Sequence, residues 1–212
     1  MRAADLAERS LRAELARERR AAICAFTQLL DLKDFGTGVH STRLAEWGVR
    51  LGRELGLREN RLHDLEVAAV LHDVGKVGVP DAILKKPGPL TPEERTEMQR
   101  HSEYGWQVLH RVPAFERASL FVLHHHEAYD GRGYPAGLKG DEIPVEARIV
   151  AIIDAFDAMI SSRPYRDGFP VPEAIARLER AAGTQFDPVL TPAFVRIATE
   201  AASVFEAIGR ET

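Results

Sequence analysis

Apolar residues recur at helical spacing along most of the chain. From Ala3 to about Leu32 they stand three, four or seven positions apart among charged residues, the pattern of a helix with one apolar face. No run of any length alternates apolar and polar residues with the two-residue period of a strand. The pattern therefore predicts an all-α fold. Further helices are expected over residues 40–55, 61–74, 91 to just before 113, 115–126, 145–160, 172–182 and 188–207.

One helix start is especially well marked. Thr91 is a preferred N-cap residue, Pro92 suits the first helical position, and Glu94 stands three residues after the cap, so the three predict a capping box. Loops are expected over residues 75–90 and 130–143, where Gly and Pro recur.

The N-terminal helix admits two interpretations. Six of the first twenty residues are Arg, interleaved with Asp and Glu, and the apolar seam is short and rich in Ala. Such a segment is either a solvated helix face or a signalling or dimer-forming coiled coil that joins the domain to a sensor. Because a Gly-containing break follows at residues 34–38, we expect an N-terminal helix over residues 1–32 and one domain over residues 33–212.

Composition narrows the function classes. The 212 residues are 45% hydrophobic and 28% charged, which supports one core and excludes a disordered or collagen-like chain. A net charge of −4 provides no bulk positive field to bind a nucleic-acid duplex. Cys24 is the single cysteine, so an internal disulfide is excluded, and no apolar run reaches the roughly 18 residues of a membrane span. Because residues 1–20 also lack a signal-peptide core, we expect a cytoplasmic protein with no membrane partner.

Histidines and acids carry the candidate chemistry. Asp73 follows a histidine directly, and Asp154 follows an apolar run in which an ionised carboxylate is costly unless a cation or donors compensate it. A metal site is the most economical explanation for such a carboxylate. Imidazole nitrogens and carboxylate oxygens together suit Zn, Mn, Fe or Ni better than calcium. Asp73 is the natural carboxylate to bridge two cations. The histidines at predicted helix ends or in apolar surroundings are His40, His72, His101, His125 and His126.

Each histidine also has a plainer interpretation. A single His on an inward helix face is more often a hydrogen-bonded core residue than a ligand. The dipeptide His72–Asp73 is repeated nine residues earlier by His63–Asp64, without the following Gly-Lys, and we interpret that earlier pair as surface. His110 is expected to be exposed at a helix C-terminus. His124 is either a core neighbour or a hydrogen-bond donor to a ligand residue.

The order and spacing of these residues resemble the HD-GYP family over about residues 34–188. The matching motifs are Leu71-His72-Asp73-Val74-Gly75-Lys76, His101 with Gly105, His125-His126-Glu127, Asp130-Gly131-Arg132-Gly133-Tyr134-Pro135, Asp154-Ala155-Phe156-Asp157-Ala158 and Arg163-Pro164-Tyr165-Arg166. The resemblance implies an HD-domain helical bundle. It also implies a metal-dependent phosphodiesterase that cleaves cyclic di-GMP to linear pGpG and, in some members, onward to GMP.

The resemblance further implies a role for each matching position. One cation would be held by His40, His72, Asp73 and Asp154, and the other by Asp73, His101, His125 and His126. Lys76 would reach the scissile phosphate or the leaving oxygen. Arg163 and Arg166 would bind the ligand's phosphates, with an ordinary surface salt bridge as the alternative for both. Tyr134 would touch substrate or a partner domain.

One departure from the family concerns the number of metals. Members with a Glu four residues before the first ligand His can hold three metals, whereas Gly36 stands at that position here. We therefore predict two divalent cations, Fe or Mn in preference to Ni or Zn. In this hypothesis the cations lower the pKa of a bridging water for in-line attack on phosphorus.

Two other functions stay open from the sequence. A catalytically silent domain would act as a cyclic di-GMP receptor or a protein-interaction module, and a general HD hydrolase would act on another phosphoester. The complete ligand set and Lys76 favour the enzyme, and the Tyr134 loop with the Arg163–Arg166 segment favours a cyclic dinucleotide. Candidate partners are a sensor or GGDEF-domain protein and a second copy bound through the N-terminal helix.

Overall fold

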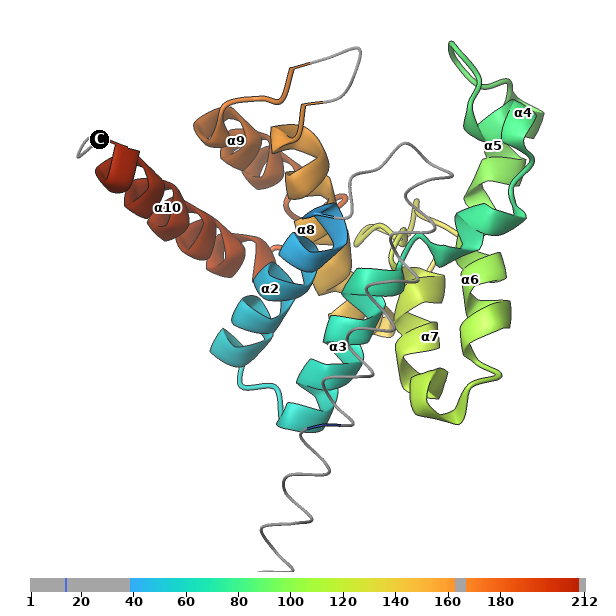
Figure 1. Ribbon diagram of the computed structural model, residues 1–212, viewed down its shortest axis with the longest axis horizontal. Helices are drawn as coiled ribbons and strands as arrows, with labels where there is room; N and C mark the ends of the chain where they lie inside the picture. Colours follow the sequence, from blue (N-terminus) through green and yellow to red (C-terminus); the bar gives the residue numbers. More distant parts are fainter. Residues whose placement is uncertain (1–13, 15–38, 163–166, 210–212) are drawn as a thin grey trace, which may run out of the picture.

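The regular elements described after residue 38 are helices, and the longest connection between two α-helices in residues 39–162 is the loop over residues 125–144 (Figure 1). The structure is a computed structural model that describes Glu14, residues 39–162 and residues 167–209, with side chains between residues 42 and 201. Within this part there is no strand, only an isolated bridge between Ala182 and Phe186, so the predicted all-α fold is confirmed. The α-helices are α2 (Val39–Glu54), α3 (Glu59–Leu71), α4 (Asp81–Leu84), α5 (Pro92–Gln99), α6 (His101–Leu109), α7 (Glu116–His124), α8 (Val145–Ile160), α9 (Val171–Ala181) and α10 (Leu190–Gly209). Short 3₁₀ turns are η1 (Val74–Gly78), η2 (Pro113–Phe115) and η3 (Gly140–Glu142).

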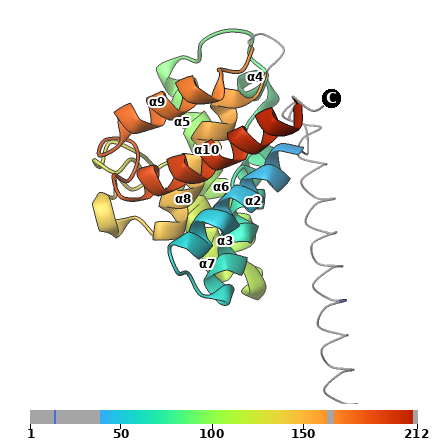
Figure 2. The ribbon, with the colours of Figure 1, turned by 90° about the vertical axis from the view of Figure 1, so that its left-hand side faces the viewer.

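Helix α8 lies at the centre of the bundle. Its buried positions include Ile149, Val150, Ile152, Ile153 and Phe156, which point in several directions around the helix. A helix that is apolar on most sides has to be covered on most sides, and α2, α3, α7, α9 and α10 all pack against it. Figure 1 shows α9 and α10 on one side of α8 and α6 and α7 on the other, and Figure 2 shows α9 and α10 side by side.

Aromatic rings join three helices on one side of this core. Trp47 of α2, Phe156 of α8 and Phe194 of α10 meet edge to face, with ring centroids 5.2 to 6.1 Å apart. Each such pair contributes roughly 0.5–1.5 kcal/mol beyond the burial of its surface. The cluster therefore fixes α2 and α10 on α8.

Ion pairs hold both ends of α8. Glu146 near its start is buried and accepts a hydrogen bond of 2.6 Å from Nε of Arg61 on α3. Asp157 near its end is also buried and pairs with Arg43 on α2, whose guanidinium donates to Ser161 Oγ at 2.7 Å. Buried carboxylates need such partners, so these contacts fix α8 in register with α2 and α3.

The structure corrects the helix predicted from Thr91 to just before Pro113. The capping box of Thr91 with Glu94 is confirmed, but the helix is interrupted at Arg100 and divides into α5 and α6. Side chains beside the interruption compete for the backbone carbonyls. His101 Nδ1–H donates to Met98 O at 2.8 Å, and Ser102 Oγ–H donates to Gln99 O at 3.1 Å. In a continuous helix these two carbonyl oxygens would accept from backbone amides instead.

Other boundaries also differ from the prediction. Helix α3 ends at Leu71 and α7 ends at His124, each earlier than the apolar pattern indicated. The candidate ligands that follow each helix therefore lie just beyond its C-terminal end and not within it. The predicted loop over residues 75–90 contains α4 and most of η1. The predicted N-terminal helix lies, apart from Glu14, outside the described residues. None of the described helices combines the length and apolar character needed to cross a membrane.

Candidate metal centre

Three chain segments meet at one point through residues at helix ends. Asp73 lies in the turn between α3 and η1, His101 is the first residue of α6, and His125 and His126 follow α7 directly. Ligand atoms of these four side chains all lie within 4.8 Å of one another. These are the four residues that the family resemblance implied for the second cation, and the structure brings them together.

Backbone carbonyls orient three of the imidazoles in the same way. In each case the ring nitrogen Nδ1 lies close to the carbonyl oxygen three residues earlier in the chain. Because a carbonyl oxygen can only accept, Nδ1 must carry the hydrogen, and Nε2 is left to face the cluster. The three bonds are His72 to Ala69 O at 2.9 Å, His101 to Met98 O at 2.8 Å and His125 to Val122 O at 2.6 Å. This arrangement is common for histidines that bind metals.

The two carboxylate oxygens of Asp73 face different neighbours. Oδ1 lies 3.5 Å from Nε2 of His101. Oδ2 lies 3.2 Å from Nε2 of His72, which is also 3.6 Å from Oδ1 of Asp154. Asp73 therefore stands between two groups of donors, as a carboxylate that bridges two cations must.

Charge controls protonation around Asp73. Burial alone would lower the pKa of His72, but the carboxylates of Asp73 and Asp154 raise it to about 9. Burial would raise the pKa of Asp73, but the charges of Lys76 and His72 hold it well below its usual range. Lys76 Nζ lies 2.8 Å from Asp73 Oδ2.

The three histidines of the donor cluster, His101, His125 and His126, are kept neutral. Burial lowers the pKa of His101. Burial and the neighbouring rings lower the pKa of His125 well below its usual range and that of His126 to about 3. Neutral imidazole is the form that binds a metal, so these three side chains are ready to act as ligands near pH 7.

The donor set fits a divalent transition metal. It combines several imidazole nitrogens with carboxylate oxygens and contains no thiolate, which suits Mn, Fe, Ni or Zn better than calcium. The group of Asp73, His101, His125 and His126 could hold one such ion.

A cavity of about 470 Å³ opens beside the cluster, and His126, Tyr134 and Asp154 are among the residues that line it. The ring of Tyr134 lies 4.9 Å from that of His126 and 6.4 Å from that of His101. Burial and the carboxylates of Asp73 and Asp154 raise the pKa of Tyr134, so its hydroxyl keeps its proton.

Asp154 is less buried than its apolar neighbours suggested. Its side chain is 24% exposed because it faces this cavity, where the adjacent wall of α8 consists of the small residues Ala151 and Ala155. The cost of burying its charge is therefore smaller than the sequence indicated.

Several predicted positions remain undescribed. The backbone of His40 lies in α2, but its side chain is outside the described part of the structure, as are Gly36, Arg163 and Arg166. Their predicted roles stay predictions.

His63, His110 and His124 are not part of the donor cluster. His63 and Asp64 are half-buried on α3 and pair with Glu66 and Arg117, so that dipeptide is less exposed than expected. His110 is exposed at the end of α6, as predicted. His124 lies 3.4 Å from the buried carboxyl group of Glu127, a residue to which the sequence assigned no role.

Known proteins resemble the chain in sequence and fold. A family model described as an HD domain matches residues 25–190. The chain is 40% identical over 179 residues to a cyclic di-GMP phosphodiesterase of Thermotoga maritima, a match that covers 84% of this chain and 49% of that protein. It is 39% identical over 166 residues to 3′3′-cGAMP-specific phosphodiesterase 3 of Vibrio cholerae, with 78% and 36% covered. The chain thus spans half or less of the length of these relatives.

A solved structure shares the fold. An HDG"Y"P protein from Bdellovibrio bacteriovorus gives a TM-score of 0.62 at 22% identity, over 76% of this chain and 51% of that chain.

Proposed function

The chain belongs to the HD domain family, within which its motifs and relatives identify it as HD-GYP type, and we propose that it is a metal-dependent phosphodiesterase that hydrolyses cyclic di-GMP to linear pGpG. The observation that carries the proposal is the convergence of Asp73, His101, His125 and His126 beside a cavity. Relatives named for cyclic dinucleotide hydrolysis support the substrate class.

The same donors divide into two sets around Asp73. His101, His125 and His126 would hold one divalent cation with Asp73, and His72 and Asp154 would hold the other with it. His40 would complete the second set from α2. When bound, such cations neutralise phosphate oxygens and activate water.

Lys76 contributes a positive charge next to the reacting phosphate. In the structure its ammonium group lies against Asp73 Oδ2, at the edge of the donor cluster. A phosphodiester bound at the cluster would therefore meet Lys76, which would stabilise negative charge on the leaving oxygen.

Tyr134 contributes a hydrogen-bond donor and an aromatic surface. Because its hydroxyl stays protonated, it would donate to an oxygen or base atom of the dinucleotide. Its ring, beside His126, would orient the ligand in the cavity. Arg163 and Arg166 would bind the ligand's phosphates.

A second candidate substrate is 3′3′-cGAMP. The identity to the Vibrio cholerae enzyme named for it, 39% over 166 residues, is close to the identity to the Thermotoga protein, 40% over 179 residues. The two cyclic dinucleotides differ in one purine, so the choice between them depends on base recognition in the cavity.

A product assay tests the proposal. Protein purified without oxygen and loaded with Mn(II) or Fe(II) is incubated separately with cyclic di-GMP, 3′3′-cGAMP and the mononucleotide cyclic GMP, and the products are separated by chromatography. We expect cyclic di-GMP to be converted to pGpG. Preference for 3′3′-cGAMP would favour the second candidate, and preference for cyclic GMP would overturn the substrate class. If metal-loaded protein binds cyclic di-GMP without cleaving it, the domain is a receptor and the enzymatic proposal is wrong.

A further inference from the structure

A buried carboxyl group behind the metal-binding histidines has no part in the mechanism described above. Glu127 follows His126 directly, and only 4% of its surface is exposed. A buried acid is costly unless hydrogen bonds compensate it, so its partners indicate what it does.

Those partners are backbone groups of a distant loop. One carboxyl oxygen of Glu127 accepts from the amide of Ala136 at 2.7 Å, and the other accepts from the amide of Leu138 at 3.1 Å. His124 Nδ1 lies 3.4 Å from the first of these oxygens. Glu127 therefore ties the loop over residues 133–138 to the turn that carries His125 and His126.

The same loop places Tyr134 beside the cluster. The amide of Tyr134 donates to His126 O at 3.2 Å. Gly133 approaches so closely that an added β-carbon would lie 2.1 Å from the amide nitrogen of Ala128, which leaves no room for the loop to move inward. The hydrogen bonds to Glu127 hold the loop a few residues after Tyr134, at Ala136 and Leu138.

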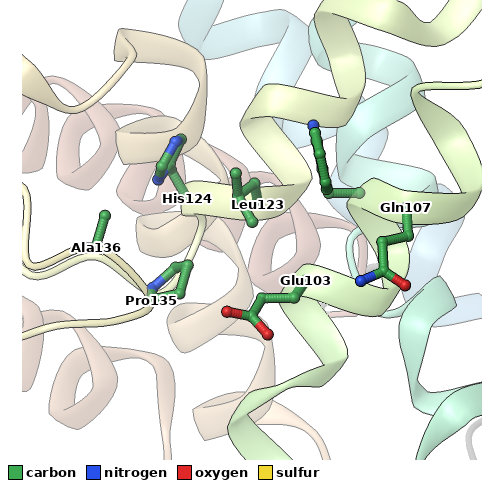
Figure 3. A pocket seen from close by; sticks show the side chains of 7 residues that line it. Glu103, Gln107, Leu123, His124, Pro135 and Ala136 are labelled. Atoms are coloured by element: carbon green, nitrogen blue, oxygen red, sulfur yellow. The ribbon is translucent and has the colours of Figure 1, made fainter.

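Little packing holds the loop from outside. Pro135 and Ala136 are exposed and border a hollow of about 400 Å³, which Figure 3 shows between the loop and Glu103 and Gln107 of α6. Leu138 at the end of the loop packs against the hydrophobic core, but Pro135 and Ala136 are uncovered on this side, so the hydrogen bonds to Glu127 are the constraint that acts on this stretch.

We propose that Glu127 is a positioning residue, which fixes the loop over residues 133–138 so that Tyr134 meets the bound dinucleotide. This inference rests on the proposed function. Glu127→Gln is the appropriate change because it keeps the side-chain volume. The amide oxygen can still accept one backbone N–H, but the new NH₂ group faces the other N–H and cannot accept from it.

Amide hydrogen exchange tests the tie to the loop without any need for activity. In Glu127→Gln we expect the amides of Ala136 and Leu138 to exchange about tenfold faster or more than in the wild type. Glu146→Gln is the matched control, since Glu146 is equally buried but pairs with Arg61 on α3. This control should lower the free energy of unfolding without selectively speeding the exchange of the Ala136 and Leu138 amides. Unchanged exchange of both loop amides in Glu127→Gln would overturn the proposal.

A double-mutant cycle tests whether Glu127 acts through Tyr134. We expect Glu127→Gln and Tyr134→Ala each to raise the KM for cyclic di-GMP about tenfold, with kcat less affected, and the double variant to be no worse than Tyr134→Ala alone. Effects that multiply would show that Glu127 does not act through Tyr134, and the proposal would be wrong. If the wild type hydrolyses no cyclic dinucleotide, the proposed function fails, and the exchange measurement still decides whether Glu127 holds the loop.

Discussion

The α-carbon of Gly75 lies directly against the backbone of His101. A β-carbon added at residue 75 would lie 1.8 Å from the carbonyl oxygen of His101 and 2.4 Å from the amide nitrogen of Gly105. Only glycine allows this approach. It brings η1 onto α6 and so sets the separation between Asp73 and His101, which contribute to the same donor cluster.

Gly75→Ala should therefore damage both stability and metal binding. The new methyl group meets backbone that cannot move aside, and overpacking of this kind costs about 1–3 kcal/mol. Asp73 and His101 would be pushed apart, so Mn(II) affinity should also fall. Urea unfolding and calorimetric titration with Mn(II) measure the two effects.

Gly78→Ala serves as the control within the same turn. Its β-carbon would lie 2.7 Å from the ring of Tyr104, so this change displaces a side chain outside the donor cluster and not the backbone of a residue within it. We expect a smaller loss of stability and unchanged Mn(II) affinity. Wild-type Mn(II) affinity in Gly75→Ala would show that this backbone contact does not set the geometry of the site.

Lys76→Ala should separate chemistry from metal binding. If Lys76 stabilises the leaving oxygen, its loss should lower kcat about 100-fold, the usual effect of removing one such donor. Metal content should change little because the lysine is not a ligand. Lys85→Ala, which removes a lysine paired with Asp81 on α4, should leave kcat unchanged. Loss of metal from Lys76→Ala, measured by elemental analysis, would contradict the assigned role.

Metal binding should release a proton from His72. In metal-free protein the pKa of His72 is raised to about 9, so this side chain is protonated at pH 7.5, whereas His126, with a pKa of about 3, is neutral. A cation that binds His72 must displace that proton, so affinity should rise with pH up to about 9. Calorimetric titration in two buffers of different ionisation enthalpy gives the proton count. No release at pH 7.5 would contradict the assignment of His72 as a ligand.

The same shift affects the stability of the metal-free protein. Because folding raises the pKa of His72 from 6.5 to about 9, its contribution is fully present below pH 6.5 and is lost as the pH rises through about 9. His126 acts in the opposite sense, since its pKa falls from 6.5 to about 3, and its contribution is lost as the pH falls through that window. Denaturant unfolding of the metal-free protein, prepared with a chelator, at several pH values measures both trends.

Much of the fold follows from local pattern. Helix α8 begins at Val145 and ends at Ile160, as predicted, because it follows Pro144 and its apolar residues are continuous. The break at Arg100 was missed because the competing bonds of His101 and Ser102 depend on side-chain geometry, which apolar periodicity does not describe. The contact of Gly75 with His101 was missed for a similar reason, since sequence spacing does not reveal which segments touch.

The candidate site divides in the same way. The histidines and acids stood out by residue type and by motif, and the structure brings Asp73, His101, His125 and His126 together. Glu127 belongs to the motif His125-His126-Glu127. Its partners are the backbone amides of Ala136 and Leu138, and because every residue type but proline has such an amide, the sequence does not reveal the pairing. Its position directly after two candidate ligands was the available signal.

Mn(II) titration of Asp73→Ala and Asp64→Ala, each compared with the wild type, tests the central claim most directly. Both variants remove the acid of a His-Asp dipeptide on or just after α3, but only Asp73 lies in the donor cluster. We predict wild-type Mn(II) affinity for Asp64→Ala and a loss of more than about 100-fold for Asp73→Ala. Residues that only support a metal ligand typically change metal affinity by about 10- to 100-fold, and loss of the ligand itself should cost more. Equal Mn(II) affinity in Asp73→Ala and the wild type would contradict the account of this site.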